Sequence, residues 1–137
     1  MLEIIFSNDT RGKIGRVSIE KIVSLAARFS KKIRGTVEVA VVGDKKIQTL
    51  NKKYRGKNKV TDVLSFSWLS GDFLGQIFIC YPQIVRQAKE YEISVDEEFA
   101  RMLVHGLLHL VGHDHVKKIE ASRMFKIQER IVDKLKM

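Results

Sequence analysis

The sequence predicts an α+β fold, in which short strands and amphipathic helices follow one another within one domain spanning residues 1–137. Two observations lead to this prediction. Four segments are rich in the β-branched and aromatic residues that strands favour. Between and after them, apolar residues recur every three or four positions, as on a helix that buries one face. A length of 137 residues is sufficient for one hydrophobic core, and no linker-like or repetitive segment divides the chain.

The first half of the chain predicts two strands, each followed by a helix. The strands are expected over residues 2–6 and 36–42, the second with every other valine on one face. We expect Ser18 and Asp44 to cap the two helices, because short polar side chains accept hydrogen bonds from the first helical N–H groups. The expected inner faces are Ile22, Leu25, Ala26, Phe29 and Ile33 in the first helix, and Ile47, Leu50 and Tyr54 in the second.

The second half begins with a predicted hairpin. Its strands, 62–68 and 74–80, are joined by a Ser-Gly-Asp turn at 70–72. Pro82 is suited to the first turn of a helix that runs to about Glu92.

The helix that follows is expected to lie at the centre of the fold. Ser94 and Glu97 form a capping box at its start. Apolar residues surround the helix nearly completely, which is typical of a helix buried on all sides. They are Phe99, Met102, Leu103, Leu107 and Leu110 on the main stripe, with Val104 and Leu108 opposite. A last helix is expected over residues 119–135, with Met124, Ile127, Ile131 and Leu135 on its inner face.

All four histidines lie in the segment HGLLHLVGHDH, residues 105–115. His105 and His109 are four residues apart and therefore share a helix face. Gly112 permits a turn that ends the helix, after which His115 can return to the same point. Three neutral imidazoles with one open position form the ligand set of a catalytic zinc site, which lowers the pKa of its bound water. The sequence therefore predicts a metal site carried by the central helix and the turn after it.

One position in this segment separates it from a peptidase motif. The three histidines and the glycine match the metzincin pattern His-Glu-x-x-His-x-x-Gly-x-x-His. Gly106 stands where that pattern has its general-base glutamate, and glycine cannot accept a proton. This argues against ordinary peptide hydrolysis and leaves phosphodiester hydrolysis open.

Two other interpretations of the histidines stay open. They could be structural side chains that share a helix face by chance, or ligands of a closed structural zinc site. A closed site needs a fourth protein ligand, for which His113 and Cys80 are the candidates. Cys80 ends an apolar run and is expected to be buried instead. Only one residue separates His113 from His115, so we expect His113 to neighbour the site.

The charge favours a polyanionic partner. The chain has 25 Lys and Arg against 16 Asp and Glu, a formal net charge of +9. A basic stretch without acidic residues contains Lys45, Lys46, Lys52, Lys53, Arg55, Lys57 and Lys59. Tyr54 lies among them and can stack on a base. The alternative is a solvated lysine-rich helix face, and an acidic stretch over 90–98 indicates that charge is segregated between faces.

The single cysteine forbids an internal disulfide and suits a reducing cytoplasm. The N-terminus lacks the basic and apolar regions of a signal peptide, and no apolar run approaches the length of a membrane span. We therefore expect a cytoplasmic protein without a membrane partner. The sequence does not predict an oligomeric state.

Three segments together resemble a known family. HGLLHLVGHDH at 105–115 resembles the signature of the YbeY family, small bacterial metalloproteins described as single-strand-specific endoribonucleases of ribosomal RNA maturation. LNKKYRG at 50–56 followed by TDVLSF at 61–66 resembles the second motif of that family, and LGQIFI at 74–79 resembles a weaker third one. The resemblance implies a mixed sheet of about four strands packed by helices, with a metal in a cleft between them.

Transferred residue by residue, the resemblance implies that His105, His109 and His115 are the metal ligands. It also implies that Arg55 is the functional arginine near the metal. Two positions depart from the family pattern. His113 stands where a tyrosine is common and would add a proton carrier. Gln76 stands where an acid is usual, so the chain has no carboxylate at that position.

The expected mechanism is hydrolysis of a phosphodiester in single-stranded RNA, assisted by one divalent ion. Zinc is expected, although imidazole also suits nickel, copper and iron. Arg55 would offer its planar fork of donors to the phosphate oxygens. His113, Asp114 or the phosphate itself would accept the proton, or Asp114 would orient a ligand ring. Asp62 is expected to make strand-end hydrogen bonds.

The leading functional prediction is a metal-dependent endoribonuclease acting on ribosomal RNA. One alternative is a ribosome-assembly factor that binds RNA or a ribosomal protein and holds a structural metal. The other is a hydrolase of a peptide or small molecule with metzincin-like geometry. Cleavage assays on single-stranded RNA, duplex RNA and peptides distinguish the three.

Overall fold

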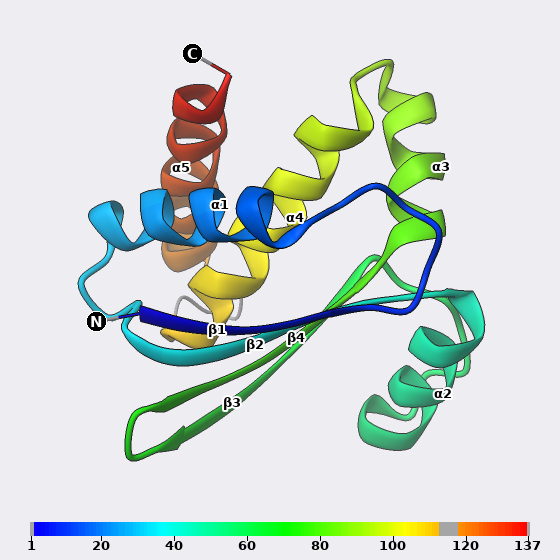
Figure 1. The fold of residues 1–137 in the computed structure, drawn as a ribbon, viewed down its shortest axis with the longest axis horizontal. Coiled ribbons are helices and arrows are strands. Elements are labelled where there is room, and N and C mark those ends of the chain that lie inside the picture. The colour runs from blue at the N-terminus through cyan, green and yellow to red at the C-terminus, as the bar shows by residue number, and fades with distance from the viewer. Residues whose placement is uncertain (1, 113–117, 137) are drawn as a thin grey trace.

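The computed structural model describes residues 2–112 and 118–136, and within these ranges it has four strands and five helices (Figure 1). The elements are β1 (Leu2–Asn8), α1 (Arg16–Phe29), β2 (Gly35–Val42), α2 (Asp44–Arg55), β3 (Val63–Ser70), β4 (Phe73–Cys80), α3 (Tyr81–Tyr91), α4 (Val95–Leu110) and α5 (Lys118–Leu135). This order confirms the predicted α+β class. No described helix is both long and apolar enough to cross a lipid bilayer.

The strands form one mixed sheet in the order β1-β2-β4-β3. β1, β2 and β4 run parallel, and β3 pairs antiparallel with β4 through the predicted hairpin turn. β3 is therefore an edge strand. Figure 1 shows α1, α4 and α5 on one face of the sheet and α2 at one end of the other face.

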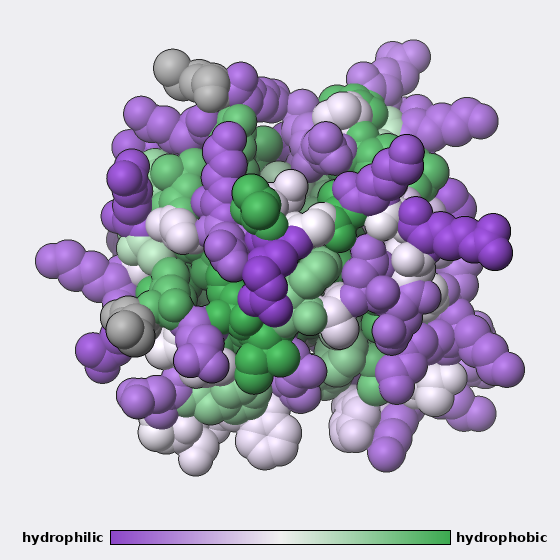
Figure 2. Space-filling view, viewed as in Figure 1, coloured by the Kyte–Doolittle hydropathy of each residue, from purple (hydrophilic) through white to green (hydrophobic). Residues whose placement is uncertain are grey.

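The two faces of the sheet bury different clusters. Val37, Val39 and Val41 of β2 point toward the core that α1, α4 and α5 complete, as the alternation of valines predicts. Ala40 and Val42 point the other way, into a smaller cluster beneath α2. α2 covers only one end of that face, so the rest of it lies open to solvent. In Figure 2, long hydrophilic side chains project around most of the molecule, and side chains of intermediate hydropathy line the lower rim, beneath the sheet.

α4 is the buried central helix that the sequence predicts. Phe99, Leu103, Val104, Leu107 and Leu108 are each at most 1% exposed, so both sides of the helix are covered. Gly106 makes the closest approach to the sheet. A Cβ at this position would lie 3.0 Å from Ile77 Cγ2 and 3.4 Å from Val63 Cγ2. Glycine is therefore the residue that fits, and a glutamate here would point into the core.

Two of the predicted helix caps were wrong. α1 begins at Arg16, two residues before Ser18, and its N-cap is Gly15. The earlier start brings Ile19 into the core, where it is fully buried. α1 also ends at Phe29, before Ile33, which is buried from the loop that follows the helix.

The second error concerns α2, whose N-cap is Gly43. Asp44 is the first residue of the helix, and its carboxylate accepts hydrogen bonds from Arg86 and from the Cys80 thiol. The Asp44 carboxylate therefore bonds Arg86 of α3 and Cys80 of β4 and does not cap its own helix. The hydrogen bond from Arg86 holds the pKa of Asp44 below its ordinary value.

One of the two hydrogen bonds of the capping box predicted for α4 is present. Ser94 Oγ accepts a hydrogen bond from the Glu97 N–H at 3.0 Å. The Glu97 carboxylate, however, pairs with Arg101 and Lys136. Pro82 lies in the first turn of α3, as expected.

Replacement of Gly106 by glutamate tests the close approach of α4 to the sheet. Gly106→Glu is expected to lower the free energy of unfolding by about 3 kcal/mol or more, because a carboxylate would be buried against Ile77 and Val63. Gly15→Glu is the control, since Gly15 is exposed and has open space around it. Denaturant unfolding measures both. Equal stability of the two variants would contradict the packing of α4.

Candidate metal centre

The first two predicted ligands lie side by side on α4. The ring centroids of His105 and His109 are 4.7 Å apart and their planes make an angle of 56°. Both side chains are half-buried. The four-residue spacing therefore brings the rings together, as the sequence predicts.

α5 supplies a partner for the His105 ring. His105 Nδ1 lies 2.8 Å from the Gln128 side-chain oxygen, and Gln128 is only 4% exposed. The Gln128 amide nitrogen donates to Glu129 Oε2 at 3.1 Å, which fixes the amide with its oxygen toward the histidine. Because an amide oxygen only accepts, Nδ1 of the neutral ring carries the proton and the lone pair lies on Nε2. A histidine that binds a metal is held in this way.

The hydrogen bonds continue from Glu129 to Arg101 on α4. The Arg101 guanidinium donates to both oxygens of Glu129, at 2.9 and 3.0 Å, and also to Glu97 and Glu98. Hydrogen bonding to Glu129 raises the pKa of Arg101. Burial raises the pKa of Glu129, but the bonds from Arg101 and Gln128 outweigh burial and leave that pKa below its ordinary value. Three carboxylates thus share one largely buried cation.

A cavity of about 480 Å³ connects these groups with the second sequence motif. Its polar lining includes His105, Gln128, Glu129 and Asp62, and its apolar lining includes Met102, Met124 and Phe125. Asp62 makes the strand-end hydrogen bond that the sequence predicts, with its Oδ1 accepting the Val63 N–H at 2.7 Å. The hairpin and the histidine helix, which are distant in sequence, therefore line the same cavity.

The structure tests only part of the predicted ligand set. α4 ends at Leu110, and Gly112 has a φ of +92°, so the turn expected after the helix is present. His113, Asp114 and His115 lie outside the described residues. Within 2–112 and 118–136, no three His, Cys, Asp or Glu side chains converge on a point that could hold a metal. The described residues that fit a divalent ion are His105 and His109, with the ring of His105 positioned by Gln128.

Arg55 is the last residue of α2 and is exposed. α2 packs on the sheet face opposite α4, and Arg55 does not line the cavity that contains His105. The structure therefore presents Arg55 to solvent at the C-terminal end of α2 and does not bring it against the two described histidines. Its predicted place near the metal stays a prediction.

Cys80 is buried and belongs to the cluster beneath α2. Burial raises the pKa of its thiol to about 12, and Sγ donates to Asp44 Oδ1 at 3.2 Å. A metal ligand must be a thiolate, which this environment disfavours. The burial predicted for Cys80 is confirmed, and its alternative role as a fourth ligand of a closed zinc site is wrong.

Gln128 is the site residue that the sequence analysis missed. A signal was present, because Gln128 follows Ile127 and precedes Ile131 on the inner face of the last helix. A polar residue on a buried helix face needs a polar partner. The identity of that partner depends on how α4 and α5 pack.

Comparison with known proteins agrees with the resemblance of the three sequence motifs. The family model described as Endoribonuclease YbeY matches residues 7–136. Endoribonuclease YbeY of Thermodesulfovibrio yellowstonii is 45% identical over 106 residues, which covers 73% of this chain and 67% of that protein. Endoribonuclease YbeY of Halalkalibacterium halodurans is 35% identical over 147 residues, covering 96% and 92%. The solution structure of TM1509 from Thermotoga maritima matches with a TM-score of 0.67 at 29% identity, covering 97% of this chain and 87% of that one.

Removal of the Gln128 amide tests its positioning of His105. Gln128→Leu is expected to weaken binding of a divalent metal ion by about ten- to 100-fold, because the ring loses the acceptor that orients it. Gln48→Leu is the control, since Gln48 bonds Asn58 near α2. Competition with a chromophoric chelator measures the affinity, and circular dichroism verifies that each variant folds. Equal affinity of the two variants would show that Gln128 does not position the ring.

Removal of Arg101 tests the buried charge cluster. Arg101→Met is expected to lower the free energy of unfolding at neutral pH by about 3 kcal/mol, because Glu98, Glu97 and Glu129 lose their shared cation. The pKa values of Glu97 and Glu129 are lowered from 4.5, so the stability that they contribute is present above that pH and is lost as the pH falls through their folded values. The variant should lose this acid dependence.

Denaturant unfolding between pH 7 and about pH 3 measures both effects. Arg86→Met is the matched control, because the side chain of Arg86 is 51% exposed in its pair on the surface. It should cost less than about 1 kcal/mol. If Arg101→Met were as stable as Arg86→Met, the cluster would contribute nothing to the fold.

Proposed function

The chain belongs to the Endoribonuclease YbeY family, and on this basis we propose that it is a metal-dependent endoribonuclease that cuts single-stranded RNA during maturation of ribosomal RNA. The proposed setting is the cytoplasm. The observation that supports the proposal most directly is the pair of His105 and His109 at the cavity, with Nδ1 of His105 held by Gln128. This is the arrangement that a metal-binding imidazole requires.

We propose that His105, His109 and His115 hold one divalent ion, most simply zinc, because a set of three imidazoles leaves one coordination position for water or substrate. An ion held there supplies Lewis acidity to a phosphate oxygen and lowers the pKa of a water molecule. Gln128 keeps the His105 proton on Nδ1, so that Nε2 can donate its lone pair. The cluster around Arg101 holds Gln128 in turn through Glu129.

The remaining chemistry is assigned to the other two motifs. Arg55 is proposed to bind the scissile phosphate, because its guanidinium matches two phosphate oxygens and stabilises the charge that develops on them. His113, Asp114 or the phosphate is proposed to accept the proton. Asp114 has the alternative role of orienting a ligand ring. Gly106 faces the sheet, so a glutamate at this position would point into the core and not toward the histidines. The proposed hydrolysis therefore uses a base from another position.

The charge of the chain supports a polyanionic substrate. The formal net charge is +9, and the basic residues between 45 and 59 lie on α2 and the loop that follows it. These side chains can attract RNA from solution and bind its phosphates without regard to sequence. Docking on the ribosome or a ribosomal protein is proposed as a second contribution to substrate choice.

Cleavage by two variants tests the proposal. His105→Ala and Arg55→Glu are both expected to abolish cutting of single-stranded RNA, and only His105→Ala should lose the metal. Cleavage of labelled RNA and elemental analysis on the same samples measure the two effects. Arg11→Glu is the control for Arg55, because it makes the same charge change at an exposed arginine in the loop after β1.

Three outcomes would contradict the proposal. They are cutting by His105→Ala, binding of RNA without turnover under any divalent metal, and cleavage of a peptide in place of RNA. Binding without turnover would favour an assembly factor, and peptide cleavage would favour a hydrolase of another class.

A further inference from the structure

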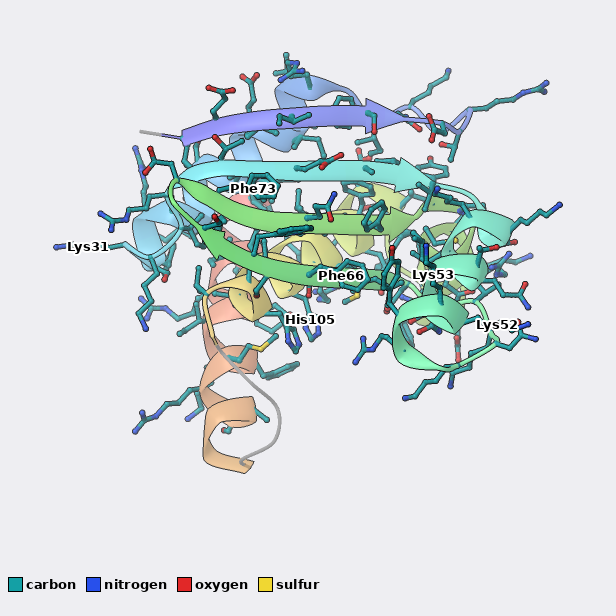
Figure 3. The ribbon with its side chains drawn as sticks, turned by 90° about the horizontal axis from the view of Figure 1, so that it is seen from below. Lys31, Lys52, Lys53, Phe66, Phe73 and His105 are labelled. Carbon is teal, nitrogen blue, oxygen red and sulfur yellow. The ribbon has the colours of Figure 1, made fainter. Side chains whose placement is uncertain are left out.

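The sheet face that α2 leaves uncovered carries a row of aromatic side chains. Phe66 and Trp68 of β3 and Phe78 of β4 lie on this face, and Tyr54 reaches it from α2. We call these four residues the aromatic platform. Figure 3 views the molecule from this side, with Phe66 on the strands, Lys52 and Lys53 on α2 at one end, and His105 past the edge of the sheet.

The rings of the platform are in contact with one another. Tyr54 and Phe66 pack edge to face with centroids 5.4 Å apart, and Phe66 and Phe78 do so at 5.9 Å. Together with Leu50 and Gln76 they line a cavity of about 330 Å³, which is within the range of small-ligand pockets. Two of the rings remain accessible, since Tyr54 is 57% and Trp68 is 59% exposed. Tyr54 thus lies on the sheet-facing side of its helix, as its spacing predicts, but its ring is exposed at the margin of the sheet and not buried.

Hydrogen bonds across the strands hold the exposed indole in place. Trp68 Nε1 donates to the Gln76 side-chain oxygen at 3.1 Å, and the Gln76 amide nitrogen donates to Glu38 at 2.9 Å. Gln76 thus has one acceptor and one donor in use. An acid at position 76 would place a second carboxylate beside Glu38. The amide adds no charge to this part of the face and orients Trp68.

Positive charge borders the platform on the side of α2. Lys53 Nζ lies 5.2 Å from the centre of the Tyr54 ring, and Lys52, Lys53 and Arg55 form the last turn of the helix. No acidic residue occurs from Lys45 to Lys59. Accessible rings beside exposed lysines are the two components of a surface that binds single-stranded nucleic acid, with bases on the rings and phosphates on the cations.

We propose that the aromatic platform binds the unpaired bases of single-stranded RNA, while Lys52 and Lys53 bind its phosphates. The proposal rests on the proposed function and adds a substrate-binding surface outside the histidine cavity. A duplex would not fit, because its bases are stacked on each other. A protein partner is disfavoured, because the rings are bordered by the lysines of α2, in a stretch without acidic residues that suits a polyanion.

The edge strand connects this surface with the histidine cavity. Leu64, Phe66 and Trp68 lie on the platform side of the sheet, whereas Val63, at the start of the same strand, packs toward α4. A strand of RNA that leaves the platform over the edge at β3 reaches the side of the molecule on which His105 lies (Figure 3). The platform would therefore hold the nucleotides that flank the bond to be cut.

The fluorescence of Trp68 gives a direct test, because it is the only tryptophan in the chain. The full-length protein is titrated with oligouridylate and oligoadenylate of about ten nucleotides, a length that suits such surfaces. Stacking of a base on the indole is expected to quench its emission. The titration is run with a chelator present, and recovery of the RNA on a gel verifies that it stays uncut. Cleavage of the same RNA is assayed separately, after a divalent ion is added to the protein. A duplex of the same length should quench much less.

Two pairs of variants identify the residues responsible. Tyr54→Ala is expected to weaken binding by about tenfold, and Ile5→Ala by less than about twofold, because Ile5 is exposed on the same sheet face but on β1. Lys53→Ala and Lys31→Ala remove the same charge from opposite ends of the molecule (Figure 3). Lys53→Ala should weaken binding by about threefold and Lys31→Ala should have little effect.

The outcomes separate this proposal from the proposed function. Quenching without cleavage would support the platform and overturn the endoribonuclease assignment. Cleavage without quenching, or equal quenching by the duplex, would overturn the platform alone. Equal losses in both members of each variant pair would also overturn it. A titration with ribosomal proteins stripped of RNA completes the test, because a change in Trp68 emission there and not with RNA would assign the platform to a protein partner.

Discussion

The packing of α4 against the sheet is the constraint on which the rest of the structure depends. The helix is covered by the sheet and by α1, α3 and α5, and at Gly106 it comes so close that an added Cβ would lie 3.0 Å from Ile77 Cγ2. A helix fixed to this degree cannot rotate without opening voids in the core. His105 and His109 are half-buried residues of this helix, so the packing of the core fixes the backbone from which their rings extend.

The described charges include an acidic cluster on α4 and α5 and a basic stretch on α2 and the loop after it. Beside His105, three glutamates surround Arg101 and one lysine, Lys136, which leaves an excess of negative charge. Around α2 the charge is entirely positive from Lys45 to Lys59. Burial of the glutamates costs solvation energy that the shared arginine offsets. The positive charge around α2 favours RNA there.

Local patterns in the sequence were sufficient for the order of the elements, the central helix and the histidine pair, because each depends on spacing along one element. They were not sufficient where distant residues compete. Asp44 was expected to cap a helix, but Arg86 provides a stronger partner from α3. Gln128 was missed because it meets His105 only through the packing of α4 on α5. Tyr54 has the spacing of an inner residue, yet α2 covers only one end of its sheet face and leaves the ring at the margin.

The environment of Cys80 disfavours oxidation of its thiol. Peroxide and disulfide exchange both attack through the thiolate, and this thiol is shielded by Ala40, Ile47 and Leu64 and kept protonated by burial. Asp44 adds negative charge at a polar contact of the sulfur, which further disfavours ionisation. The chain therefore has no thiol-based means of sensing the redox state of the cell, and any control over it must act through another chemistry.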